Sequence, residues 1–146
     1  MTKKETVRIP LWFPIVAILA MLWNLLGVRS FVAQMSMDDA MIANLPDRQR
    51  EVLQAMPTWA IVAFGVAVIC GAVGSMLLAL KNRASVAVLW LSLIAVLVQN
   101  THNFFLSDAL EVYGSQAIVL PIVVIVIAIG LAILSLRANR DGWLAQ

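Results

Sequence analysis

The charged residues of this chain are confined to a few short stretches, and their spacing limits the folds that the chain can adopt. Four intervals contain no Asp, Glu, Lys or Arg: 20 residues between Arg8 and Arg29, 29 between Glu51 and Lys81, 24 between Arg83 and Asp108, and 25 between Glu111 and Arg137. A helix needs about 20 mainly apolar residues to cross the hydrocarbon core of a bilayer. Each interval is long enough, and a helix satisfies its own backbone hydrogen bonds in lipid. The sequence therefore predicts an all-α membrane protein with four spans.

Composition supports this prediction. The chain has 146 residues, of which 62% are hydrophobic and 12% are charged, whereas soluble domains average about 25% charged residues. A water-soluble fold of this size could not bury so much apolar surface. We expect a single domain, residues 1–146, embedded in the lipid bilayer, with spans at about 10–28, 58–80, 85–106 and 116–136 and an outer loop at 29–57.

The first predicted span has one alternative interpretation. Lys3, Lys4 and Arg8 come directly before its apolar run, as they would in a secretory signal that is later cleaved. The run is long for a signal core, and residues 27–30 offer a poor small-residue cleavage site. These features favour a retained helix.

Lys and Arg are distributed unevenly among the loops. The amino terminus, the second loop and the carboxyl terminus together carry seven of them, and the first and third loops carry three. Six of the eight acidic residues lie in the first and third loops. Short segments rich in Lys and Arg stay in the cytoplasm. The sequence therefore predicts that both termini are cytoplasmic, which agrees with an even number of spans.

The first outer loop has room for structure of its own. Ser36 and Asp39 indicate a capping box at the start of one short helix. Pro46 indicates the start of a second helix, because proline favours the first helical turn. Apolar residues recur along both segments, so we expect two short amphipathic helices that lie over the outer end of the helix bundle.

Each predicted span carries small residues at helical spacing. The clearest set occupies every fourth position of the second span and consists of Ala63, Ala67, Gly71 and Ser75. Small residues let helices approach closely, which drives helix association in lipid. The short second and third connections favour neighbours that run in opposite directions. We expect these residues to pack an antiparallel four-transmembrane-helix bundle.

Uncharged polar residues gather near the outer ends of two predicted spans: Asn24 in the first, and Gln99, Asn100, His102 and Asn103 in the third. Gln99, His102 and Asn103 are three and four residues apart and should share one helix face. Exposure to lipid tails would cost these side chains free energy, so we expect them to turn inward and meet. They could form a polar pocket, open to the outside, for a small hydrogen-bonding ligand. The alternative is a clamp of hydrogen bonds between helices, or simple hydration at the membrane interface, and it is favoured because these residues are uncharged and lie near the surface.

Few groups in the sequence could carry out catalysis or hold a cofactor. One His and one Cys are too few for a zinc site or a bis-histidine haem, and no Ser–His–Asp set can be assigned to one depth in the bilayer. No span contains a carboxylate that could couple transport to protons. The net charge of +2 could indicate nucleic-acid binding in a soluble protein, but here the excess of Lys and Arg is explained by the predicted cytoplasmic segments. We therefore expect neither an enzyme, nor a metal or cofactor site, nor a nucleic-acid partner.

Several short motifs resemble those of a known group of proteins. They are Trp23-Asn24-x-x-Gly27, Pro57-Thr58-Trp59, Gly71-Ala72-Val73-Gly74 before Leu77-Leu78, and the polar end of the third span. Together they resemble a group of small bacterial four-span membrane proteins that automatic naming often labels sugar transporters. The resemblance covers nearly the whole chain. It implies a four-helix architecture, a bacterial inner membrane and a role in transport.

Two functional hypotheses follow. The first is a small-solute transporter-like or permeation protein, alone or as a homo-oligomer, whose outer pocket is lined by the polar residues of the first and third spans. The second is a non-catalytic accessory subunit or scaffold whose small-residue faces dock another membrane protein. In both hypotheses the lipid bilayer surrounds the chain.

Overall fold

The computed structural model describes residues 6–145 of the chain. These residues form helices and contain no β-strand; one isolated bridge pairs Asn82 with Ala145. Four helices are long and apolar enough to cross a membrane: α1 (Trp12–Met35), α4 (Thr58–Ala79), α5 (Ala84–Thr101) with its π-helical continuation η1 (His102–Leu106), and α7 (Gln116–Arg140). The prediction of an all-helical chain with four such helices is confirmed.

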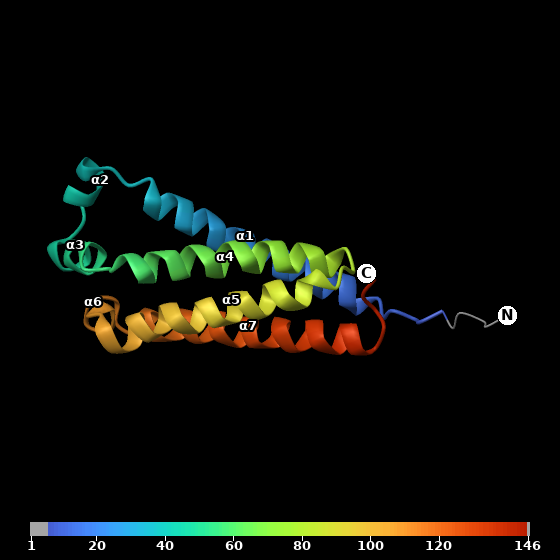
Figure 1. Ribbon diagram of the computed structural model, residues 1–146. Helices are drawn as coiled ribbons and strands as arrows, with labels where there is room; N and C mark the ends of the chain where they lie inside the picture. Colours follow the sequence, from blue (N-terminus) through green and yellow to red (C-terminus); the bar gives the residue numbers. More distant parts are fainter. Residues whose placement is uncertain (1–5, 146) are drawn as a thin grey trace.

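The long helices lie side by side, and both ends of the described chain lie at the same end of the bundle (Figure 1). We call this end the terminal end, and the opposite end the loop end. The loop end carries the short helices α2 (Asp39–Ala43), α3 (Asp47–Gln54) and α6 (Ala109–Tyr113). α4 and α5 pack against each other, α1 packs on α4, and α7 packs on α5, whereas α1 and α7 make few contacts with each other. The helices therefore form an open row rather than a closed ring.

Local sequence explains where the short helices begin. Pro46 precedes α3, because a proline suits the start of a helix, where its missing N–H is not needed. Asp38, rather than Ser36, caps α2: its carboxylate accepts a hydrogen bond from the backbone N–H of Met41 at 2.7 Å. The predicted capping box at Ser36 is thus replaced by an aspartate cap, which satisfies one of the free N–H groups in the first turn.

α1 and α7 extend beyond the predicted spans. α1 continues past Arg29 to Met35, and α7 continues past Arg137 to Arg140. Backbone hydrogen bonding does not stop at the surface of the hydrocarbon core, and neither extension contains a glycine or proline that would end a helix. The basic residues in the last turn of α7 also interact favourably with the helix dipole.

A hydrophobic core closes the terminal end of the bundle. Phe13 and Leu78 are fully buried in it, and Leu144 is 3% exposed. The ring of Phe13 packs edge to face on that of Trp143, with centroids 5.3 Å apart. Residues 141–145 fold back across this end, and the N–H of Arg83 donates a hydrogen bond to the carbonyl oxygen of Ala145 at 3.0 Å. The segment after α7 is therefore held against the turn between α4 and α5.

Burial decreases from the terminal end toward the loop end in the two peripheral helices. Buried residues of α4 occur along its whole length, from Ala60 to Leu78. In α1 and α7 they all lie in the half nearer the terminal end: Phe13, Ala17 and Ala20 in α1, and Leu131, Ala132, Ser135 and Ala138 in α7. The loop halves of α1 and α7 instead border open space.

Candidate functional site

A cavity of about 340 Å³ lies in the loop half of the bundle, between α1, α4, α5 and α7. Its polar lining consists of Asn24, Ser30, Gln99, Asn100 and Asn103. Its apolar walls include Trp23, Phe64, Val68, Leu120 and Pro121. We call this space the amide cavity. Its volume falls within the range of about 300–1,000 Å³ that is typical of ligand pockets.

The amide cavity forms because α1 packs against α4, whereas α7 packs against α5. Gly65 lets the ring of Phe31 lie against α4: a Cβ on Gly65 would be 2.9 Å from Phe31 Cζ. Phe31 also packs edge to face on Phe64, with ring centroids 5.3 Å apart. These contacts join the loop half of α1 to α4. The loop end of α1 diverges from both α4 and α7 (Figure 1).

Hydrogen bonds form the floor of the amide cavity, on the side of the terminal end. Asn24 Nδ2 donates to Ser75 Oγ of α4 at 3.2 Å and to the carbonyl oxygen of Ala20 at 2.8 Å. Ser92 Oγ of α5 donates to the carbonyl oxygen of Ala67 in α4 at 2.7 Å. A void of about 20 Å³ adjoins this floor, which is room for one water molecule.

Two amides of the cavity make no hydrogen bond within the described chain. Asn100 Nδ2 donates to the carbonyl oxygen of Val96, within its own helix, at 2.8 Å. The side chains of Gln99 and Asn103 make no hydrogen bond to any residue of the described range 6–145. A side-chain amide offers two donor hydrogens and an acceptor oxygen. Gln99 and Asn103 can therefore both donate to and accept from a ligand.

The cavity has a neutral lining. None of the described residues that line it is Asp, Glu, Lys or Arg. Burying a charged ligand without a charged partner would be costly, so the lining favours an uncharged ligand. Within residues 6–145, no group of three His, Cys, Asp or Glu side chains could hold a metal ion.

The structure brings four of the five predicted site residues to the amide cavity and places His102 elsewhere. His102 is 5% exposed and packs edge to face on Trp59 of α4, with ring centroids 5.6 Å apart. It lines a separate crevice between α3, η1 and α6. At 3.6 residues per turn, His102 and Asn100 point in directions about 160° apart. One face of the helix cannot present both side chains to the same cavity.

The four small residues of α4 that are predicted to pack against other helices lie inside the chain. Ala63, Ala67, Gly71 and Ser75 are all buried. A Cβ on Gly71 would overlap the side-chain oxygen of Asn24, and it would lie 3.3 Å from Ser92 Oγ. This face of α4 therefore contacts α1 and α5 and is not part of the surface.

The aromatic and proline walls of the cavity could not be recognised from the sequence pattern alone. Trp23 was assigned no role in a site, although it is adjacent to Asn24. Pro121 lies inside α7, where it cannot donate a backbone hydrogen bond. Ser30 falls beyond the predicted end of the first span. A proline within an apolar span was the available signal for the α7 wall.

Comparisons of the chain with protein-family models, with curated proteins and with solved structures found no match. The amide cavity is therefore the basis on which a function can be assigned.

Proposed function

We propose that this protein is a small-solute transporter-like or permeation protein that binds an uncharged, hydrogen-bonding solute in the amide cavity. The observation that carries this proposal is the arrangement of four amide side chains around a single open space. In a clamp between helices, these amides would bond to one another. Within the described chain, no hydrogen bond joins Asn24 to the amides of α5 and η1.

The chemistry of the lining defines the class of solute. Gln99 and Asn103 offer donors and acceptors together, which suits hydroxyl, amide and carbonyl groups. The neutral lining disfavours ions, and the side chains of Trp23 and Phe64 provide apolar contact for the carbon skeleton of the solute.

In this proposal the four long helices form an antiparallel bundle in a bacterial inner membrane, with the terminal end in the cytoplasm. The distribution of charge supports this orientation. Among residues 6–145, the cations of the terminal end are Arg8, Lys81, Arg83, Arg137 and Arg140. Short cytoplasmic segments are enriched in such residues. The amide cavity would then lie on the outer side of the membrane.

The alternative of an accessory subunit has less support. Its docking surfaces were the small-residue faces of the spans, and in the clearest of them Ala63, Ala67, Gly71 and Ser75 are buried between helices of the same chain. A partner could reach them only by separating α1 or α5 from α4.

Solute entry into proteoliposomes tests the proposal. The purified protein is reconstituted in phosphatidylcholine liposomes, and the entry of glycerol and of urea is followed by light scattering. We expect entry to be faster than in protein-free liposomes. The double substitution of Gln99→Leu with Asn103→Leu should return the rate of entry to the protein-free value. It removes both amide groups that are available to the solute and replaces them with apolar side chains of similar size.

Thr101→Val is the matched control for this double substitution. It removes a polar group from the same helix, but Thr101 is exposed and its hydroxyl bonds to the carbonyl oxygen of Leu97 at 2.9 Å, outside the cavity. We expect unchanged entry. Wild-type entry no faster than in protein-free liposomes, or undiminished entry through a correctly folded double variant, would overturn the proposal.

A further inference from the structure

A groove of about 500 Å³ adjoins the amide cavity along the seam between α1 and α7. One wall is formed by residues of α1, including Val16 and Trp23, and the other by residues of α7, including Ile127, Gly130 and Leu134. Trp23 lines both spaces, so the groove and the amide cavity are neighbours on the two sides of this side chain. We call this space the seam groove. Its lining is almost entirely apolar, whereas the amide cavity also carries amide side chains.

The seam groove extends in the direction that a lipid chain takes in a bilayer. The amide cavity lies in the loop half of the bundle, and the groove continues from Trp23 toward Val16, nearer the terminal end. At 1.5 Å per residue, these two positions on α1 are about 10 Å apart along the helix axis. A molecule whose polar head lies in the amide cavity would therefore direct a hydrocarbon chain from the loop-side surface toward the bilayer centre.

We propose that the ligand of the amide cavity is an uncharged single-chain amphiphile, with its hydrogen-bonding head in the cavity and its hydrocarbon chain in the seam groove. This inference rests on the proposed function and narrows its class of solute. The free amides of Gln99 and Asn103 bind the head. A phosphate-bearing head would find no Lys or Arg among the residues that line the cavity.

The open seam gives such a ligand a route of entry from the membrane. α1 and α7 make few contacts with each other. Leu26 on α1 and Leu120 on α7 line the amide cavity, and they are 58% and 59% exposed. An amphiphile in the loop-side leaflet can thus enter sideways, between two helices, without leaving the lipid.

Gly130 provides a substitution that fills the groove. A Cβ on Gly130 would meet no atom within 4 Å, so Gly130→Phe adds a ring to the groove without overlap at its first carbon. Ile129→Phe is the matched control, because Ile129 is exposed on α7 and does not line the groove. Val16→Phe fills the groove from the α1 wall and serves as the second blocking variant if Gly130→Phe fails to fold.

Photolabelling tests the proposal. The protein is placed in phosphatidylcholine nanodiscs with a monoacylglycerol that carries a photoreactive diazirine in its acyl chain, and the labelled peptides are identified by mass spectrometry. We expect labels on the groove-lining positions of both α1 and α7. Gly130→Phe should reduce them roughly tenfold, whereas Ile129→Phe should leave them unchanged. Unlabelled monoolein should compete at far lower concentrations than glycerol, because glycerol has no hydrocarbon chain to occupy the groove.

Three results would overturn the inference. They are labels spread evenly over all lipid-facing positions, competition by added phosphatidylcholine equal to that by monoolein, and cross-linked dimers joined through the seam peptides of two chains. If one of these results is obtained but glycerol entry into proteoliposomes still depends on Gln99 and Asn103, an amphiphilic ligand is excluded and the proposed function stands. If neither labelling nor glycerol entry depends on these residues, both proposals fail.

Discussion

The side-chain oxygen of Asn24 occupies the space that a Cβ atom on Gly71 would need. This contact lets α1 approach α4 at the floor of the amide cavity, where Asn24 also donates a hydrogen bond to Ser75. Gly71 lies within a regular helix, so its role is to provide space for a neighbour rather than an unusual backbone angle.

Gly71→Ala should destabilise the protein. The added methyl group forces Asn24 to move, and overpacking of this kind costs about 1–3 kcal/mol in the free energy of unfolding. Thermal unfolding of the detergent-purified protein measures the change. Gly130→Ala is the control, because its Cβ meets nothing within 4 Å and alanine is the better helix former. An equal loss of stability in both variants would contradict this account of Gly71.

The hydrogen bond between Asn24 and Ser75 should give a measurable coupling energy. A double-mutant cycle with Asn24→Ala and Ser75→Ala isolates it, and we expect a value of about 0.6 kcal/mol, the average for polar contacts between membrane helices. Ser135 provides the control, because its hydroxyl bonds within α7 to the carbonyl oxygen of Ala132. Asn24→Ala and Ser135→Ala should be additive. A coupling as large in the control cycle would show that the cycle reports general loosening of the fold.

Leu144→Ala should weaken the terminal end of the bundle. Leu144 is 3% exposed and belongs to the core around Phe13, so its truncation leaves a cavity and costs about 2 kcal/mol or more. The midpoint of chemical unfolding in detergent measures the loss. Leu136→Ala changes a leucine of α7 that is 45% exposed and should have a much smaller effect. Equal midpoints for the two variants would contradict the packing of residues 141–145.

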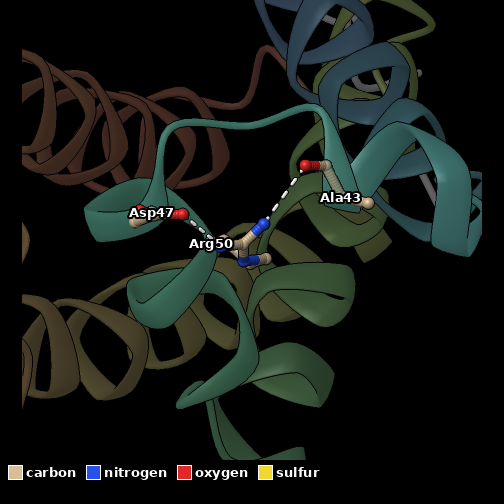
Figure 2. Close-up of polar contacts among 3 residues, drawn as sticks. All are labelled: Ala43, Asp47 and Arg50. Atoms are coloured by element: carbon tan, nitrogen blue, oxygen red, sulfur yellow. Dashed lines mark hydrogen bonds and ion pairs between the residues drawn. The ribbon is translucent and has the colours of Figure 1, made fainter.

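Arg50→Ala should loosen the loop end without unfolding the bundle. Arg50 of α3 donates a hydrogen bond to the carbonyl oxygen of Ala43 at 3.1 Å, and this bond joins α3 to α2 (Figure 2). Arg50 also pairs with Asp47 within α3. We expect faster amide hydrogen exchange in residues 39–54, with a change in global stability below about 1 kcal/mol.

Arg48→Ala is the control for this experiment. Arg48 pairs with Glu111 at 3.6 Å, but both side chains are exposed, and such pairs contribute little. The rate of amide hydrogen exchange in α2 should stay as in the wild type. Similar acceleration by both substitutions would contradict a specific role for Arg50.

The long helices could be predicted because lipid imposes a strong constraint on sequence. A charge in the hydrocarbon core is costly, so the charge-free intervals around α4 and α7 indicate these helices directly. The ends of helices are less constrained. Arg29 indicated the edge of the first span, but α1 continues to Met35, since nothing in the backbone ends it there.

The amide cavity could be predicted only in part. The tendency of Asn24 and Gln99 to face inward follows from the cost of exposing amides to lipid. Whether they would meet or leave a gap depends on how far the loop half of α1 lies from α5, and there Phe31 of α1 contacts Gly65 of α4. Helical spacing alone grouped His102 with Gln99, although the buried position of His102 also depends on Trp59 in another helix.

The open row of helices has a consequence for how this protein can vary. Since α1 and α7 each pack on the α4–α5 pair, substitutions in the loop half of α1 and in that of α7 share few neighbours, and their energetic effects should add without epistasis. Around Phe13 and Leu144 the same two helices contribute to one core, and changes there should be interdependent. Selection can therefore reshape either wall of the cavity separately, while substitutions at the opposite end must be matched to one another.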